Sequence, residues 1–97
     1  MNFAFNQAAL IEYREAAGWY QSRSLFAGPR FIQEIETAIQ AILQDPRRYQ
    51  PVDNGCQVFR LKRFPYKLYY LHEPELITIY AVLHDRRKPD VWRDRLG

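Results

Sequence analysis

The sequence predicts a single α+β domain in which a small antiparallel sheet, made of a short N-terminal strand and a three-strand C-terminal meander, packs against a helical hairpin. Two amphipathic segments follow one another over residues 7–44, and three short strand-like segments follow over residues 56–84. With 97 residues, 47% of them hydrophobic and 15% aromatic, the chain is expected to fold as one domain over residues 1–97.

Local signals set the bounds of the expected hairpin. The alternating residues 3–5 are typical of a short strand, and Asn6 is a suitable N-cap for a helix over about residues 7–24. Gly28 and Pro29 begin a second helix, because proline is tolerated in a first turn where its missing N–H is not needed. This helix is expected to end at Asp45, because the ring of Pro46 disfavours helical backbone at the preceding residue.

The second half of the chain predicts the meander. Residues 46–55 contain two prolines and end in Asn-Gly, which indicates a connecting loop. Strands are expected over residues 56–64, 66–71 and 76–84, followed by one or two turns of helix within residues 88–96. By strict alternation along the third strand, one face is expected to meet the helices, and it carries Ile77, Ile79, Ala81 and Leu83.

Positive charge is concentrated toward the C-terminus. Residues 1–55 carry five Lys/Arg and six Asp/Glu, whereas residues 56–97 carry nine and five. The electrostatic field of such an uneven charge distribution accelerates encounters with nucleic acid or with an acidic protein segment. Cys56 is the single cysteine, so a cytoplasmic location is the simplest expectation, and we expect neither a signal peptide nor a membrane helix.

The cations of the meander form a candidate anion-binding surface. Arg60 and Lys62 share a face of the first meander strand, Arg63 lies at the turn, and Lys67 and residues 84–87 are expected to approach this row. Such a surface suits phosphate groups. The plainer alternative is a solvated edge whose charges prevent strand aggregation. The candidate residues for target or nucleic-acid binding are Arg60, Lys62, Arg63, Lys67, Tyr80, His84, Arg86 and Arg87.

His84 has two possible roles. A histidine beside an arginine can transfer a proton near neutral pH, which suits RNA cleavage by attack of a 2′-hydroxyl. The favoured role is structural, with the histidine hydrogen-bonding the following loop and orienting Asp85 and Arg86. No phosphate-cradling glycine loop, serine elbow or HExxH helix is present in the sequence, so we expect no metal site and no cofactor.

The sequence resembles the RelE/ParE superfamily of bacterial type II toxins, and the ParE branch more closely. The resemblance covers nearly the whole chain and lies in the ordered segments EYREAAGWYQ, FIQEIETAIQAILQDPRRY, FRLKRFPYKLYY and YAVLHDRRKPDVWRDR. It implies the α+β fold described above, inhibition of growth, and a cognate antitoxin whose often acidic segment covers the toxin's apolar and basic grooves. Complementary charge would mainly accelerate that association and make it specific.

The two branches of the superfamily imply different activities. ParE-like members poison DNA gyrase without a catalytic group, whereas RelE-like members cleave ribosome-bound messenger RNA and commonly have a late tyrosine or histidine. This chain has neither residue after Arg87. The resemblance therefore implies a gyrase inhibitor that needs no cofactor. Two alternatives are a degenerate member that only binds its partner and a metal-independent endoribonuclease that uses Arg60, Lys62, His84 and Arg87.

Overall fold

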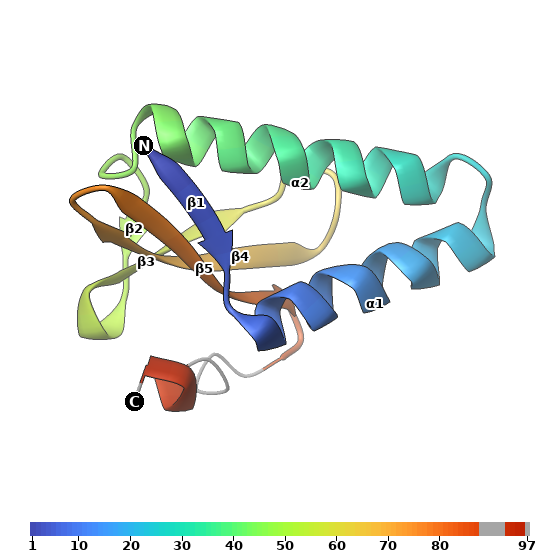
Figure 1. Ribbon diagram of the computed structural model, residues 1–97. Helices are drawn as coiled ribbons and strands as arrows, with labels where there is room; N and C mark the ends of the chain where they lie inside the picture. Colours follow the sequence, from blue (N-terminus) through green and yellow to red (C-terminus); the bar gives the residue numbers. More distant parts are fainter. Residues whose placement is uncertain (88–92, 97) are drawn as a thin grey trace.

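The computed structural model describes residues 1–87 and 93–96, in which two helices pack on one face of a five-stranded sheet with the order β1-β5-β4-β3-β2 (Figure 1). Two short 3-10 turns, Asp53–Gly55 and Asp94–Leu96, accompany these elements. In chain order the helices and strands are β1 (Asn2–Phe5), α1 (Gln7–Arg23), α2 (Ala27–Gln44), β2 (Gln50–Pro51), β3 (Cys56–Arg60), β4 (Tyr66–Glu73) and β5 (Leu76–His84).

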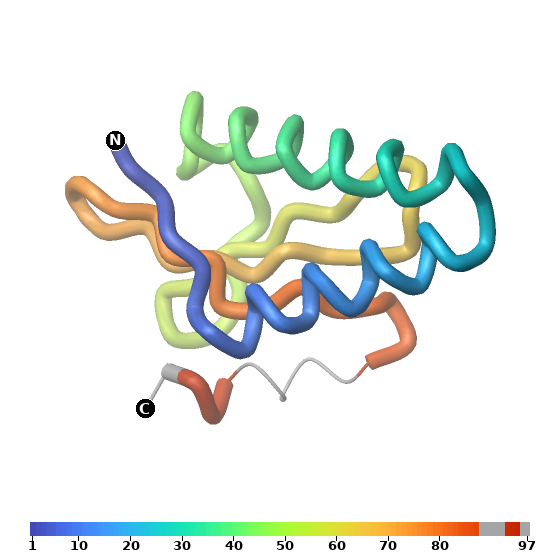
Figure 2. Tube along the Cα trace, turned by 45° about the vertical axis from the view of Figure 1, so that its right-hand side comes forward, coloured from blue at the N-terminus to red at the C-terminus, as the bar shows by residue number. Residues whose placement is uncertain are grey.

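The predicted α+β class is confirmed, and the sheet is mixed. The strands from β2 to β5 pair antiparallel, but β1 runs parallel to β5, with Asn2 opposite Leu76 and Phe5 opposite Ile79. In the chain, the two helices and strands β2 to β4 lie between β1 and β5. In the sheet, β1 pairs with the edge of β5 that faces away from β4. Figure 2 shows the hairpin extending past one end of the sheet.

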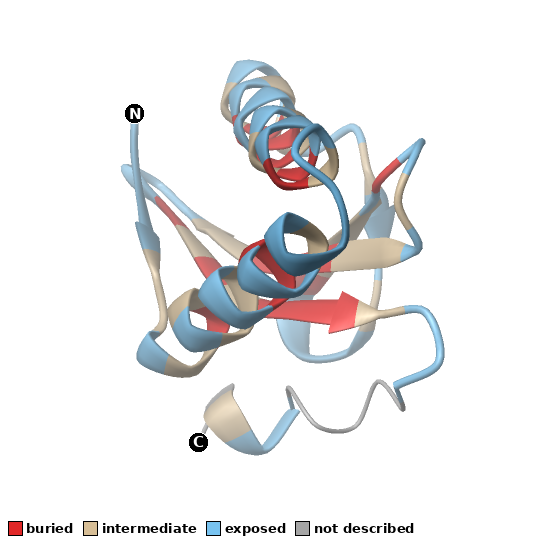
Figure 3. Ribbon diagram, turned by 90° about the vertical axis from the view of Figure 1, so that its right-hand side faces the viewer, coloured by how far each residue is buried: buried red, intermediate tan, exposed pale blue. Residues whose placement is uncertain are grey.

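The helices begin and end close to the predicted residues. The side chain of Asn6 accepts a hydrogen bond from the Ala8 N–H at 2.9 Å, which satisfies one of the free donors at the start of α1. At the end of α2, the N–H of Asp45 donates to the Ala41 carbonyl. The inner faces of both helices are buried against the sheet (Figure 3), and the buried residues of α2 are Gly28, Phe31, Ile35, Ala38, Ile39 and Ile42.

The strict alternation predicted along β5 is wrong beyond Ile79. Opposite β4, Ile79 pairs with Tyr70 and Ala81 pairs with Tyr69, so Tyr80 is an extra residue in a β-bulge. A one-residue insertion reverses the faces of all the residues that follow it. Val82 therefore joins Ile77 and Ile79 in the core beneath the helices. Ala81 and Leu83 lie instead on the opposite face, in a second buried cluster with Cys56 and Tyr69.

The ends of the other strands also differ from the predictions. β3 ends at Arg60 and not at residue 64, and β4 continues to Glu73, two residues beyond its predicted end. The predicted loop 46–55 contains the short strand β2 and a turn in which Asn54 and Gly55 have positive φ angles of 61° and 77°. Of the helix expected in residues 88–96, residues 88–92 lie outside the described residues, and Asp94–Leu96 is a 3-10 turn.

Candidate partner-binding site

Arg60 and Lys67 lie side by side on the face of the sheet opposite the helices. They are register partners on β3 and β4, and Lys67 is opposite Leu83 on β5. Asp85 Oδ1 lies 3.4 Å from Arg60 Nη1 and 3.9 Å from Lys67 Nζ. The structure therefore brings together two of the predicted cations, and a carboxylate from the turn after β5 lies between them.

An open concavity extends from this pair toward β2. Its lining includes the ion pair between Arg93 and Asp53, and burial raises the pKa of the Tyr69 hydroxyl at its floor. Because each of the three cations here already pairs with one of two carboxylates, an incoming anion must compete with internal ion pairs. The lining residues are Gln50, Val52, Asp53, Val58, Arg60, Lys67, Tyr69 and Arg93.

Lys62 and Arg63 do not share the face of Arg60 and Lys67. Both are exposed residues of loop 61–65, and Glu34 of α2 fixes the backbone of this loop. The Glu34 Oε1 atom accepts hydrogen bonds from the N–H groups of Lys62 and Arg63, both at 2.7 Å. A carboxylate that accepts two backbone N–H groups holds the loop against the helix, so the two cationic side chains project from a fixed backbone.

His84 faces the helix side of the sheet and not the side of Arg60 and Lys67. Its ring lies 5.2 Å from the ring of Tyr66, and its Nδ1 atom accepts a hydrogen bond from the Arg86 N–H at 3.0 Å. This geometry suits the structural role, in which the histidine orients the following turn. Arg86 and Arg87 are exposed in that turn. Of the residues proposed for RNA cleavage, Arg60 and His84 therefore lie on opposite faces of the sheet.

Tyr80, the remaining candidate, lies at the bulge of β5. Its carbonyl accepts a hydrogen bond from Arg95 Nη1 at 2.8 Å, and the N–H of Val82 donates to Glu12 Oε1 at 3.0 Å. Glu12 and Arg95 also bind each other. Neither residue is predictable from the sequence as part of a site, because the two lie 83 positions apart and no local pattern relates them.

Aromatic rings join the hairpin to the end of the sheet. The ring centroid of Tyr20 lies 4.8 Å from that of Phe64, and Phe31 lies 5.3 Å from Tyr66. Contacts at these distances are typical of edge-to-face aromatic packing. Helix α1, helix α2, loop 61–65 and the start of β4 thus form one packed unit, which fixes the position of the cations in the loop relative to the hairpin.

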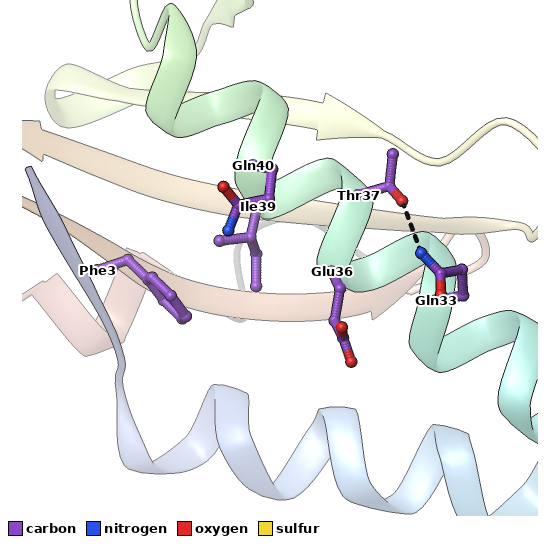
Figure 4. A pocket seen from close by; sticks show the side chains of 6 residues that line it. All are labelled: Phe3, Gln33, Glu36, Thr37, Ile39 and Gln40. Atoms are coloured by element: carbon purple, nitrogen blue, oxygen red, sulfur yellow. Dashed lines mark hydrogen bonds between the residues drawn. The ribbon is translucent and has the colours of Figure 1, made fainter.

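A second open groove lies between β1 and α2 (Figure 4). Gln33 Nε2 donates a hydrogen bond to Thr37 Oγ1 at 3.4 Å along one side, and Phe3 lies across from the helix. None of its lining residues is a predicted site residue, and none carries a positive charge. They are Phe3, Gln33, Glu36, Thr37, Ile39 and Gln40.

Among the described residues, neither a group of metal-ligand side chains nor a membrane-spanning helix is found. Within residues 1–87 and 93–96, no three His, Cys, Asp or Glu side chains are grouped so that they could hold a metal ion. Among the same residues, neither helix combines the length and apolar character needed to cross a bilayer.

Comparison with known families adds the decisive observation. A family model described as "ParE toxin of type II toxin-antitoxin system, parDE" matches residues 3–89. The chain belongs to the ParE toxin family. The match confirms the predicted superfamily and the predicted branch, and it spans both helices and all the sheet strands except the first residue of β1. No curated protein matches the sequence.

A solved structure supports the ParE-family fold. The chain is similar to one from the "Chromosomal ParDE TA system from P. aeruginosa", with a TM-score of 0.70 and 16% sequence identity. The alignment covers 87% of this chain and 95% of that chain. At this identity, the similarity shows a shared fold for nearly the whole of both chains.

Proposed function

We propose that this ParE-family chain is the toxin of a type II toxin-antitoxin system, that it inhibits DNA gyrase by binding in the cytoplasm, and that a cognate acidic antitoxin neutralises it. The family match over residues 3–89 carries the proposal. The antitoxin follows from the same family, and the cationic C-terminal half suits an acidic partner.

The arrangement of the candidate residues favours binding over RNA cleavage. Arg60 and Lys67 lie on one face of the sheet, whereas His84 packs against Tyr66 on the other face. General acid-base catalysis needs the proton-transferring group within hydrogen-bond reach of the reacting atoms. A phosphate held by Arg60 and Lys67 would lie across the sheet from His84, so the geometry supports an inhibitor that acts by contact.

The experiment compares two activities of the purified protein. In a supercoiling reaction with relaxed plasmid and gyrase, the protein is expected to block supercoiling or to accumulate gyrase-cleaved DNA. Messenger RNA on translating ribosomes is expected to stay intact. Gyrase activity that is unchanged at saturating protein would refute the proposal. Expression without the antitoxin is expected to arrest growth, which separates an active toxin from a degenerate member that only binds its partner.

A further inference from the structure

Strand β1 forms an edge of the sheet, and this edge lacks the usual protection against pairing with another chain. In the described part of the protein β1 pairs with β5 alone, and Figure 3 shows it at the left margin of the molecule. Its register with β5 runs without a shift, and residues 1–11 contain no charged side chain and no proline. Natural edge strands are usually blocked by charges, prolines or bulges. A further strand can therefore approach β1 from outside.

The backbone of β1 has hydrogen-bonding groups that face this open side. The Asn6 N–H donates to the Ile79 carbonyl of β5 at 2.9 Å. Successive residues of a strand direct their backbone groups alternately to its two sides, so Phe3 and Phe5 direct theirs away from β5. No described residue binds these outward groups. The edge thus presents two donors and two acceptors to an incoming strand.

The side chains of the same two residues are held in fixed positions. The ring centroid of Phe3 lies 6.1 Å from that of Phe5, and Phe5 stacks on Tyr13 of α1 at 5.6 Å. The ring of Phe3 points into the groove beside α2 (Figure 4), and the residue is 41% exposed. Because these rings are already ordered, their contact with a further strand costs little side-chain entropy.

The surface around this edge carries almost no side-chain charge. Among the residues that line the groove, Glu36 is the single charged one. An acidic segment or a nucleic acid would gain no cationic contact here, in contrast to the concavity that contains Arg60 and Lys67. A second copy of β1 would meet no row of like charges. The composition of the edge therefore favours pairing of β1 with itself.

We propose that two copies of this chain associate by pairing their β1 strands, antiparallel, about a twofold axis at Ala4. In this register Phe3 of each copy lies opposite Phe5 of the other, and the two residues exchange both of their backbone hydrogen bonds. The two sheets become one continuous sheet across the axis. The inference goes beyond the proposed function, because it holds whatever enzyme the toxin inhibits.

The structure of β1 selects the position of the axis. An axis at Ala4 is the register in which the outward groups of both phenylalanines find partners within the bounds of β1. The two alanines then face each other as a non-hydrogen-bonded pair, in which the Cα atoms approach to about 4.5 Å. Ala4 is exposed and small, so it permits this approach. The facing rings of Phe3 and Phe5 form cross-strand aromatic pairs, which stabilise neighbouring strands.

The test follows the sedimentation velocity of the complete protein over a concentration series. The parent is expected to shift from monomer to dimer as its concentration rises. Ala4→Lys and Ala4→Glu are each expected to weaken the dimer about tenfold or more, because like charges then face each other across the axis. An equimolar mixture of the two variants is expected to restore the dimer, since opposite charges then meet. Ala4 is exposed, and thermal melts confirm that each variant folds.

Two controls locate the interface. Gln50→Lys adds the same charge to β2, the strand at the opposite edge of the sheet, and it is expected to leave the association unchanged. Amide hydrogen exchange at Phe3 and Phe5 is expected to slow as the dimer forms. Exchange at Asn6 should stay the same, because its N–H already binds β5.

Several results would overturn the inference. One is a monomer throughout the concentration series, including a monomer whose β1 edge binds an extended peptide of another protein. Another is a dimer that forms equally well in both Ala4 variants, or one that their mixture fails to restore. Equal weakening by Gln50→Lys, or exchange at Phe3 and Phe5 that does not change with protein concentration, would also contradict pairing through β1.

Discussion

Arg95 and Glu12 form a bidentate ion pair that covers the edge of β5 at the point where β1 ends. Arg95 Nη2 lies 2.7 Å from Glu12 Oε2, and Arg95 Nη1 lies 2.9 Å from Glu12 Oε1. The same two side chains bind the Tyr80 carbonyl and the Val82 N–H. The pairing of β1 with β5 ends at Phe5 and Ile79. Beyond this point, the side chains of Glu12 and Arg95 bind the backbone groups of β5 that a neighbouring strand would otherwise bind. The hydrogen bond to Glu12 raises the pKa of Arg95.

We expect Glu12→Gln to lower the free energy of unfolding by about 2–4 kcal/mol, because it leaves the mostly buried Arg95 cation without its counter-charge. The side chains of Glu12 and Arg95 are only 14% and 17% exposed. The control Arg60→Ala breaks an ion pair in which the arginine is 65% exposed, and it should cost less than about 1 kcal/mol. Urea unfolding measures both. Similar losses in the two variants would contradict the proposed role of the pair.

The contact between the helices at Gly28 gives a second prediction. A Cβ atom at this position would lie 2.1 Å from Gln21 Cγ and 3.1 Å from Gln21 Cα, so Gly28→Ala must push α1 and α2 apart. We expect a net loss of about 1–3 kcal/mol, despite the better helix propensity of alanine. Gly18→Ala is the matched control, because a Cβ atom there would meet nothing within 4 Å. The control should gain about 0.5–1 kcal/mol in thermal or urea unfolding. Two losses of equal size would refute this account.

The stability of the protein is expected to fall at alkaline pH. Burial raises the pKa of Tyr70 above its usual value of 10.0, and its hydroxyl donates a hydrogen bond to the Pro46 carbonyl at 2.6 Å. Above about pH 10, the unfolded chain releases this proton while the folded chain retains it, so the free energy of unfolding decreases with rising pH. Below about pH 10, the Tyr70 hydroxyl makes its full contribution to the free energy of unfolding.

The variant Tyr70→Phe isolates this group. Near neutral pH the variant should be about 1 kcal/mol less stable than the parent, because it lacks the hydrogen bond to the Pro46 carbonyl. At pH 11 the difference should narrow, since only the parent loses stability through Tyr70. Urea unfolding at both pH values provides the measurement. A difference that is the same at both values would show that the hydroxyl does not titrate as described.

Glu34 is expected to control the order of the loop that carries Lys62 and Arg63. Glu34→Ala removes the acceptor of both backbone N–H groups, so amide hydrogen exchange at these two residues should accelerate about tenfold or more. Exchange at Leu68 and Ile79, which are buried in the core, should change little. Uniform acceleration across the sheet would instead indicate global destabilisation.

The sequence was most informative where structure depends on adjacent residues. Asn6 and Pro46 marked helix ends because capping and the proline ring act within one turn of helix. The bulge at Tyr80 was not predictable, because it exists only in the pairing of β5 with β4. Strict alternation without this bulge places Ala81 and Leu83 on the wrong face of the sheet.

Only part of the candidate site was predictable from the sequence. Arg60 and Lys67 were expected near each other because they lie on adjacent strands, and the register places them opposite one another. Lys62 was assigned to the same face because β3 was expected to continue past Arg60. The strand ends earlier, and a carboxylate from α2 binds the backbone N–H groups of the loop that follows. That contact joins residues 28 positions apart, and no local pattern predicts it.

Gyrase inhibition and RNA cleavage can be compared directly by measuring both with one preparation of the protein. Gyrase supercoiling of relaxed plasmid and cleavage of messenger RNA on translating ribosomes are followed over one concentration series. Supercoiling is expected to be lost as the protein approaches saturation, with no new RNA ends at any concentration. Full supercoiling throughout the series, with new RNA ends that His84→Ala abolishes, would contradict this expectation.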